Sequence, residues 1–503
     1  MTMALVPDTE IAVVGAGAMG AGIAHVAAAA GHTVLLFDQK EGAAIAGIAD
    51  IRKRLERAVE KARISEVDKD QTLSRLVPAG TLASLASADL VIEAIIEDLG
   101  IKKKLFAALE DIVADTAILA TNTSSFSITE LAADLKNSGR VVGMHFFNPA
   151  PVMKLVEVVS GLQTSAKVTE TVFETAIRWG KKPVNTKSTP GFIVNRVARP
   201  YYYEAFRALE EGAAPPQVID CALKSGGGFR MGPLELTDLI GQDVNSAVSR
   251  SIFEAYSHQV RFAPSLLQEE LVAAGKLGRK TGHLIYSQDE CVPFASETGL
   301  EPSNIIVSAA LGAAESLVTL LELNDCAFTI DESLQEGVIV CGEIFLALTD
   351  GQTATARSAA LGRPVVLFDY AADYSKSKHV FLAPADQASA EDILMAVGFF
   401  QNLGKAAVLI DDHPGMLVMR TIASLSNVAA DAARDKVASP SDIDTAMIYG
   451  VNYPDGPLEW AKRVGIKSIS QTLRNLAETT GEAKYRPSSY LLRQAAREMT
   501  LAN

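Results

Sequence analysis

A glycine-rich turn near the start of the chain constrains the fold more than any other feature. Gly15, Gly17 and Gly20 form a GxGxxG pattern between an apolar run at 11–14 and a long alanine-rich stretch. The glycines allow a sharp turn, close approach of a ligand to the backbone, and close packing of a helix on a strand. The pattern therefore predicts a strand, a tight turn and a helix, the opening of a doubly wound α/β domain.

The same turn predicts a dinucleotide site. The amino end of the expected helix offers free N–H groups and a positive dipole end to a pyrophosphate. Asp38 closes the next apolar run, and a carboxylate there accepts hydrogen bonds from ribose hydroxyls and repels a 2′-phosphate. NAD is therefore expected rather than NADP, although FAD uses the same fingerprint. The expected cofactor-binding residues of this segment are Gly15, Gly17, Ala18, Met19, Gly20 and Asp38.

The apolar runs predict two α/β regions, each followed by a helical region. In the first half the runs alternate with helical patterns, which indicates a parallel sheet covered on both faces. The pattern becomes helical from Thr189, and a polar stretch after Ser287 is a plausible linker. The expected strands are 11–14, 33–37, 90–94, 117–121, 141–144, 337–340, 364–368, 380–382 and 407–410. The expected class is α/β plus all-α, with a Rossmann domain at 1–187, a helical domain at 188–290, a degenerate Rossmann-like domain at 305–411 and a second helical domain at 412–503.

The second helical region repeats the first. TPGFIVNR at 189–196 matches HPGMLVMR at 413–420, and MGPLE at 231–235 matches DGPLE at 455–459, both at an offset of 224 residues. Several matches at one offset indicate a duplicated domain. The region before the second copy contains no GxGxxG, so we expect it to be a scaffold and not a second cofactor site.

A histidine and a glutamate are the first candidates for acid–base chemistry. His145 falls at the end of an expected buried strand, where open α/β sheets bind ligands, and Glu157 lies within a later apolar run. A buried carboxylate needs a partner, and a histidine–carboxylate pair is a common way to build a base that works near neutral pH. A structural histidine and an unrelated surface glutamate would show the same spacing, so the residues alone leave the role open.

Five segments together resemble the (S)-3-hydroxyacyl-CoA dehydrogenase family over residues 8–286. They are GAGAMGAGIA, DLVIEAIIEDLGIKKKLF, TNTSSFSITELA, HFFNPAPVMKLVEVV and TPGFIVNR. The resemblance implies NAD-dependent oxidation of a (3S)-3-hydroxyacyl-CoA to the 3-oxoacyl thioester. It implies that His145 is the general base and that Glu157 orients and polarises it. Ser124 and Asn195 would contact the substrate, and for Ser124 ordinary turn chemistry is the alternative.

The resemblance also implies contacts with the cofactor and with coenzyme A. The matching positions on the cofactor side are Glu97, Lys102, Ser124, Asn148 and Lys280. The alternative for Glu97 and Lys102 is a solvent-exposed helix start, and the segment after Lys280 reads GHLIY where the family has GxGFY. Arg54 and Lys61 lie in a basic stretch where the family helix meets coenzyme A, although a charged, solvated helix is equally consistent with it.

The whole chain is similar to a long bacterial form of this family, which implies 3-hydroxyadipyl-CoA of phenylacetate breakdown as the substrate. 3-Hydroxybutyryl-CoA is one alternative, and a non-catalytic NAD-binding relative is another. Met419 stands where the first copy has Asn195, so one active site per chain is expected. The second copy would form an internal pseudo-dimer with the first or only add stability, and a homodimer is also possible. Arg261 is a guess, on composition alone, for a contact with an adipyl carboxylate, and an exposed surface arginine is the alternative.

Charge and cysteine usage exclude several other classes. A net charge of −14 argues against nucleic-acid binding, which needs a basic surface. The four cysteines show neither CxxC pairs nor nearby histidine ligands, so reduced thiols, no metal site and a cytoplasmic location are expected. No signal-peptide pattern and no apolar run of about 20 residues are present, so no membrane contact is expected.

Overall fold

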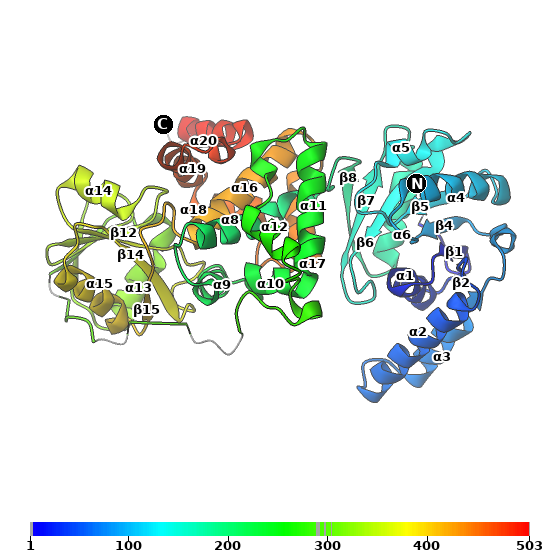
Figure 1. Ribbon diagram of the computed structural model, residues 1–503, viewed down its shortest axis with the longest axis horizontal. Coiled ribbons are helices and arrows are strands. Elements are labelled where there is room, and N and C mark those ends of the chain that lie inside the picture. Colours follow the sequence, from blue (N-terminus) through cyan, green and yellow to red (C-terminus); the bar gives the residue numbers. More distant parts are fainter. Residues whose placement is uncertain (1–3, 288–291, 296–297, 303, 502–503) are drawn as a thin grey trace. The chain divides into compact units, whose positions relative to one another are not determined.

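The computed structural model describes residues 4–287, 292–295, 298–302 and 304–501. Cys291 and part of the expected linker lie outside these described residues. The chain divides into two compact units, Met1–Arg196 with Asp435–Val451, and Val197–Arg434 with Asn452–Asn503 (Figure 1). No helix in the described part of the chain has both the length and the apolar character that a membrane span requires.

An eight-stranded sheet forms the centre of the first unit, in the order β3-β2-β1-β4-β5-β6-β7-β8. Its strands are β1 (Glu10–Val14), β2 (Thr33–Phe37), β3 (Leu76–Pro78), β4 (Leu90–Glu93), β5 (Ile118–Thr121), β6 (Val141–Phe146), β7 (Leu155–Ser160) and β8 (Lys182–Lys187). Its helices are α1 (Ala18–Ala29), α2 (Ala43–Glu60), α3 (Glu66–Ser74), α4 (Leu99–Ile112), α5 (Ile128–Ala132), α6 (Ala166–Arg178) and α17 (Pro440–Val451), while α7 (Val194–Val197) crosses the unit boundary.

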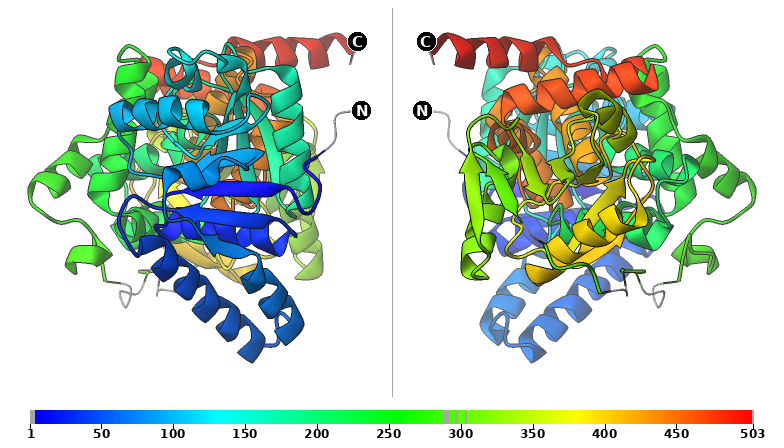
Figure 2. Two further views of the ribbon diagram at one scale, coloured as in Figure 1. Left: turned by 90° about the vertical axis from the view of Figure 1, so that its right-hand side faces the viewer. Right: turned by 90° about the vertical axis from the view of Figure 1, so that its left-hand side faces the viewer.

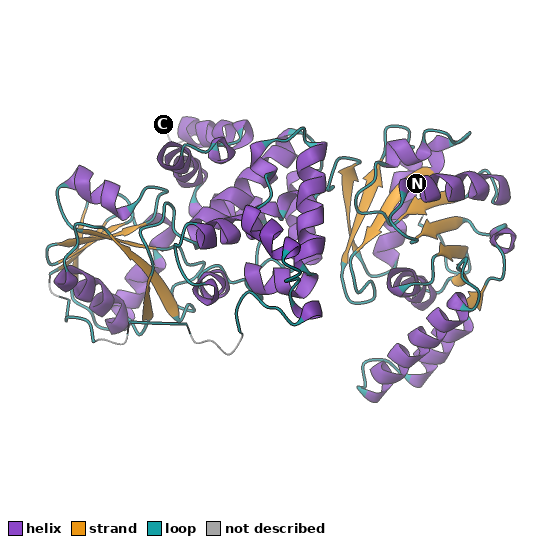
Figure 3. Cartoon of the chain, viewed as in Figure 1, coloured by secondary structure: helices purple, strands orange, loops and turns teal. Residues whose placement is uncertain are grey.

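Both faces of this sheet are buried, as the apolar runs predict. Ile11 and Val13 of β1 pack into one hydrophobic cluster with α1 and α6, and Ala12 and Val14 pack into another with α4 and α5. Alternate residues of a strand point to opposite faces, so a strand covered on both sides is apolar throughout. Figure 3 shows helices on both sides of the strands.

The sheet departs from the expected parallel arrangement at one place. β6 and β7 are antiparallel, whereas the other neighbouring strands are parallel. The expected strands of the first half are all present, but β3, β7 and β8 were not anticipated. β3 is only three residues long, and β8 reads KPVNTK with exposed residues between buried ones, so neither gives a continuous apolar signal.

A seven-stranded sheet lies in the second unit, in the order β10-β9-β11-β12-β13-β14-β15. Its strands are β9 (Ile305–Ser308), β10 (Phe328–Asp331), β11 (Val338–Cys341), β12 (Ile344–Leu348), β13 (Val365–Phe368), β14 (His379–Pro384) and β15 (Ala406–Leu409). The helices of this unit are α8 (Arg199–Glu210), α9 (Pro216–Ser225), α10 (Pro233–Ile240), α11 (Gln242–Ala255), α12 (Leu266–Ala273), α13 (Ser316–Leu323), α14 (Ala354–Leu361), α15 (Ala390–Asn402), α16 (Val418–Arg434), α18 (Pro457–Val464), α19 (Ile466–Thr480) and α20 (Ser489–Leu501). The expected class, α/β plus all-α with a second sheet, is confirmed.

The repeat appears in both the starts and the contacts of the helices. α9 and α10 begin at prolines, and so do α17 and α18, 224 residues later. Arg196 donates to Asp435 at 2.6 Å, and Arg420, at the position of Arg196 in the second copy, donates to Glu211 at 3.1 Å. Glu211 is in turn the first-copy counterpart of Asp435. The backbone repeats this pattern, with Lys187 N on Val437 O at 2.8 Å and Asp411 N on Ala213 O at 3.0 Å. Each copy thus contacts the other through the same positions, which is the rule for a two-fold interface.

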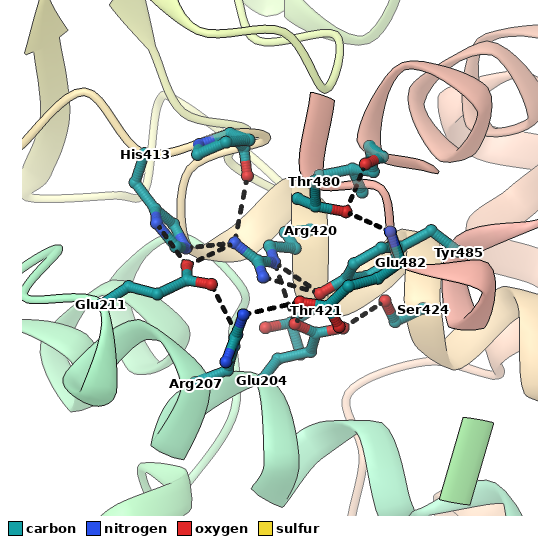
Figure 4. A network of polar contacts seen from close by, with 12 residues as sticks. Glu204, Arg207, Glu211, His413, Arg420, Thr421, Ser424, Thr480, Glu482 and Tyr485 are labelled. Carbon is teal, nitrogen blue, oxygen red and sulfur yellow. Dashed lines mark hydrogen bonds and ion pairs between the residues drawn. The ribbon is translucent and has the colours of Figure 1, made fainter. Parts of the chain in front are cut away.

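Arg420 is the centre of a buried polar network in the second unit (Figure 4). Its guanidinium donates to Glu204 Oε2 at 2.9 Å and to Tyr485 Oη at 2.7 Å, and Glu204 Oε1 accepts from Ser424 at 2.7 Å. Glu204 lies on α8 of the first copy and Arg420 on α16 of the second. Removing one partner of such a buried pair typically costs about 3–5 kcal/mol, because it leaves an uncompensated charge.

Candidate active site

The antiparallel pairing of β6 and β7 places His145 directly opposite Glu157. His145 Nδ1 lies 2.7 Å from Glu157 Oε2, and the two residues are 7% and 1% exposed. Because an ionised carboxylate can only accept, we assign the hydrogen to Nδ1. Nε2 then carries the lone pair and is free to accept a proton from a bound molecule.

Glu157 also fixes the segment that carries Asn195. Its second oxygen, Oε1, accepts hydrogen bonds from the backbone N–H groups of Ile193 at 2.9 Å and Val194 at 3.1 Å. These donors lie where α7 begins, and Asn195 follows directly. The interpretation of Glu157 as an unrelated surface residue is therefore wrong, because one buried carboxylate joins the histidine strand to the asparagine helix.

Ser124 lies in a loop held by Glu97. Glu97 Oε1 accepts hydrogen bonds from the Thr123 hydroxyl at 2.5 Å, the Ser125 hydroxyl at 2.7 Å and the Ser124 N–H at 3.1 Å. The loop follows β5, the strand beside β6. Asn122 Oδ1 accepts from the N–H of Phe146, next to His145, at 2.8 Å. The candidate substrate contact and the candidate base are therefore held at adjacent strand ends.

Lys102 connects this loop to the interior of the domain. It is 1% exposed, and its ammonium lies 2.6 Å from Glu93 Oε1 and 3.1 Å from Glu97 Oε2. Burial works to raise the pKa of Glu97, but the Thr123 hydrogen bond and the Lys102 charge outweigh it and lower that pKa. The alternative of a solvent-exposed helix start is wrong for Lys102, because its side chain is buried in the protein.

The glycine turn leaves room for a dinucleotide. A Cβ on Gly15 would lie 2.4 Å from Ala94 O, and one on Gly20 would lie 1.8 Å from Gly15 O, so neither position admits a side chain. A Cβ on Gly17 would meet nothing within 4 Å, so the backbone is open there. The turn borders a cavity of about 850 Å³, which is in the range of cofactor sites.

Asp38 lines the same cavity next to the glycine turn. Its Oδ2 accepts from Ala16 N at 2.7 Å and its Oδ1 from Lys40 N at 2.9 Å, which fixes the carboxylate at the end of β2. The cavity is lined by Gly15, Gly17, Ala18, Met19, Asp38, Glu97, Lys102 and Asn122, among others. The open backbone, the fixed carboxylate and the volume fit an adenosine dinucleotide.

Other candidate residues do not line this cavity. Asn148 is exposed on the loop after His145, and Arg54 and Lys61 lie at the end of α2, which projects with α3 from the sheet (Figures 1 and 2). Lys280 belongs to the second unit, where its ammonium pairs with Asp243.

Arg261 is partly buried and lines a cavity of about 370 Å³ in the second unit. It pairs with Asp431 at 3.0 Å and donates to two backbone carbonyls, those of Lys484 and Arg486. The alternative of an exposed surface arginine is wrong, because Arg261 is partly buried and holds two helical segments of the second unit together. The contact with an adipyl carboxylate stays a prediction.

Family comparisons cover nearly the whole chain. The NAD binding domain of 3-hydroxyacyl-CoA dehydrogenase matches residues 10–189, and the C-terminal domain of the same enzyme matches both 191–288 and 415–501. The chain belongs to the 3-hydroxyacyl-CoA dehydrogenase family. A reduced Rossmann-fold domain of 3-hydroxybutyryl-CoA dehydrogenase matches 346–414. These matches confirm the NAD-dependent oxidoreductase class, the duplication and the reduced second sheet domain.

Several dehydrogenases of this family are similar to the chain. The 3-hydroxyadipyl-CoA dehydrogenase of Escherichia coli K12 is 48% identical over 487 residues, 97% of each protein. The mitochondrial hydroxyacyl-coenzyme A dehydrogenase of Sus scrofa is 44% identical over 284 residues, 55% of this chain and 90% of that protein. A crystal structure of 3-hydroxybutyryl-CoA dehydrogenase from Escherichia coli K12 has a TM-score of 0.91 and 46% identity, and the match covers 99% of this chain and 100% of that one.

The second sheet of this dehydrogenase lacks the histidine–glutamate pair. The register of β14 on β15 repeats that of β7 on β8 at the 224-residue offset, which places Phe381 where the first half has Glu157. Asp369, whose N–H donates to Phe381 O at 3.0 Å, stands in the place of His145. Its carboxylate accepts backbone N–H bonds at the start of α16, as Glu157 does at the start of α7. The second half thus keeps the carboxylate that holds the helix start, but it has no histidine base.

Sequence reasoning missed several residues of the dehydrogenase site. Glu93 and Thr121 are buried and support the Ser124 loop from inside the domain. Lys181 donates to two carbonyls of the loop after His145. An acidic residue closing an otherwise apolar strand, as Glu93 does in LVIE, is the signal that could have found the first. Among the described residues, no group of three potential ligands is placed to hold a metal ion.

Proposed function

We propose that this dehydrogenase oxidises (3S)-3-hydroxyadipyl-CoA to 3-oxoadipyl-CoA in phenylacetate breakdown. The buried pair of His145 and Glu157, beside the loop of Ser124 and a dinucleotide cavity, is the observation that carries the oxidation. The choice of acyl group is supported by the Escherichia coli relative of that name, which matches along 97% of both proteins.

The proposed reaction assigns one task to each side chain. His145 Nε2 takes the proton of the 3-hydroxyl while the C3–H bond breaks with its electron pair. NAD⁺, when bound, accepts that hydride. Glu157 stabilises the imidazolium that forms, while Ser124 and Asn195 hydrogen-bond to the substrate and orient C3. In the reverse direction, the protonated His145 is the acid that completes reduction of the 3-ketone.

The remaining expected contacts are proposed on the family resemblance. The proposed cofactor contacts are Gly15, Gly17, Ala18, Met19, Gly20, Asp38, Glu97, Lys102, Ser124, Asn148 and Lys280, and the proposed coenzyme A contacts are Arg54 and Lys61. We keep the four-domain division given above and a cytoplasmic location. The reciprocal contacts of the two helical copies support an internal pseudo-dimer.

A shorter substrate is the second candidate. The crystal structure with a TM-score of 0.91 is that of a protein described as 3-hydroxybutyryl-CoA dehydrogenase, which favours 3-hydroxybutyryl-CoA for this fold. The adipyl thioester carries a CH₂CH₂COO⁻ group on C3 where the butyryl thioester carries a methyl group, so a direct comparison separates them.

The test follows NADH formation from (3S)-3-hydroxyadipyl-CoA and (3S)-3-hydroxybutyryl-CoA. The wild type is compared with His145→Ala and with His258→Ala, a control at an exposed histidine of the second unit. We expect a higher kcat/KM for the adipyl thioester, a loss of about 100-fold or more in His145→Ala, and no loss in the control. A higher kcat/KM for the butyryl thioester overturns the substrate assignment, and no turnover of either favours the binding-protein interpretation.

A further inference from the structure

We propose that Glu93 is a positioning residue of this dehydrogenase, which holds the cofactor-side lysine and the substrate-side loop in place together. The inference rests on the proposed function, because it assumes that Lys102 meets the cofactor and that Ser124 meets the substrate. Glu93 does not line the cavity, so it acts through these neighbours and not on the reacting atoms.

Glu93 is fully buried at the end of β4, and both of its oxygens are used. Oε1 accepts from the Lys102 ammonium at 2.6 Å and from the Ile95 N–H at 2.7 Å. Oε2 accepts from the Thr121 hydroxyl at 2.6 Å. One carboxylate thus ties together the ends of two neighbouring strands and the first turns of α4.

Two routes lead from Glu93 to the site. Through Lys102, whose ammonium is shared with Glu97 Oε2 at 3.1 Å, Glu93 sets the position of the carboxylate that holds the Ser124 N–H. Through Thr121, whose oxygen accepts from Thr123 N at 3.1 Å, it sets the backbone of the same loop. The Ser124 loop is therefore fixed from both sides by one buried group.

The negative charge of Glu93 matters because a single ammonium serves two carboxylates. Lys102 lines the cavity and remains near its floor while Glu93 draws it inward. Without that charge, Glu97 is the one ionised partner that remains to the ammonium among the described residues, so the ammonium shifts toward Glu97 and the loop that Glu97 holds shifts with it. Charged hydrogen bonds in a buried site are the strong ones, so their loss affects both ends of the network.

Glu93→Gln removes the charge and keeps the shape. The matched control is Glu110→Gln, on the same helix α4 as Lys102. Glu110 is a largely buried carboxylate that accepts from Lys136 N and Asn137 N at 2.9 Å, and it lies outside the cavity lining. We expect Glu93→Gln to raise the Kd for NADH, measured by its fluorescence, and to lower kcat, each roughly tenfold or more. We expect Glu110→Gln to change both by less than about twofold.

A double-mutant cycle with Lys102→Met tests the route. If Glu93 acts on cofactor binding through Lys102, Glu93→Gln in the Lys102→Met background should change the NADH Kd by less than about threefold. A full effect in that background overturns the route, and wild-type Kd and kcat in a folded Glu93→Gln overturn the proposal.

Thr121→Val carries the test if Glu93→Gln does not fold. It cuts only the second route, so kcat for the acyl-CoA should fall while the NADH Kd stays within about twofold, and an unchanged kcat overturns that route. Absence of wild-type turnover on either thioester counts against the proposed function alone, since the NADH titrations still report on Glu93 and Lys102.

Discussion

Glu157 satisfies three donors with two oxygens, and each oxygen has a separate task. Oε2 faces Nδ1 of His145, and Oε1 faces the N–H groups of Ile193 and Val194. A glutamine has one accepting oxygen and one NH₂ group. If the oxygen keeps the two backbone donors, the NH₂ faces Nδ1 and forces the hydrogen onto Nε2, where it blocks proton uptake.

Glu157→Gln should therefore lower kcat by about 100-fold to 10,000-fold while the KM for NAD changes little. Steady-state kinetics over a range of pH values measures this. Glu170→Gln, at an exposed position of α6, is the control and should behave as the wild type. Equal kcat in the two variants would show that the tautomer of His145 does not depend on Glu157.

Local patterns predicted some residues of the site and missed others. The glycine turn and Asp38 could be predicted because the backbone requirement lies within one strand, one turn and one helix. The pairing of His145 with Glu157 depends on the antiparallel register of β6 and β7, which no local pattern gives. Glu93 escaped notice, and so did its pairing with Lys102, because charged residues at strand ends and helix starts are usually solvated and only the tertiary fold buries these two.

At the scale of elements, α17 of the second helical copy belongs to the first unit and packs against β7 and β8. Gly450 allows this, because a Cβ there would lie 2.5 Å from a Leu155 methyl and 3.1 Å from a Val194 methyl. Val194 begins the helix that carries Asn195. The second copy therefore covers the strands and the helix start on which the active site is built.

A chain that ends at residue 290 lacks α17, and the apolar surface of β7 and α7 is then uncovered. Such a fragment still contains α9, whose Gly226 meets Val418 in the second unit as Gly450 meets Val194 in the first. We expect the soluble fragment to form a dimer through α9, and light scattering after size exclusion measures its mass. A monomeric fragment with full activity would show that α17 is dispensable.

Only some of the strands could be predicted from the sequence, for a physical reason. The central strands β1, β2, β4, β5 and β6 are buried on both faces and give continuous apolar runs, so they were found. The strands β9 and β10 were missed because they are short and partly exposed, and they lie at one edge of the second sheet. The strand β12 was missed although it is central in the sheet, and only two of its five residues are partly exposed. Edge strands carry a weaker apolar signal than central ones.

At the scale of the whole molecule, each unit holds a histidine whose surroundings disfavour its protonation. Burial and the charges of Arg54 and Lys181 lower the pKa of His25 from 6.5 to about 4. Burial and the charge of Arg420 lower the pKa of His413 as well. Because both groups bind fewer protons when folded, the free energy of unfolding falls as the pH drops from about 6.5 toward 4.

Replacing His25 with phenylalanine should remove part of this acid sensitivity. Nδ1 of His25 has no hydrogen-bond partner among the residues that the structure describes, so the replacement breaks no hydrogen bond of that atom. Urea unfolding at pH 7.5 and pH 5.0 should show a smaller loss of unfolding free energy in His25→Phe than in the wild type. Parallel losses in both proteins would exclude His25 as a source of the acid sensitivity.

The reciprocal pairs Arg196–Asp435 and Arg420–Glu211 have a further consequence. Both halves of this two-fold interface are encoded in one polypeptide, so their association is intramolecular and its effective concentration is set by the connecting chain. Dilution cannot separate them, whereas an interface between two chains dissociates below its Kd. The second half therefore needs no catalytic residues of its own: it has Asp369 and Phe381 in place of the histidine and the glutamate, and it remains bound to the half that reacts.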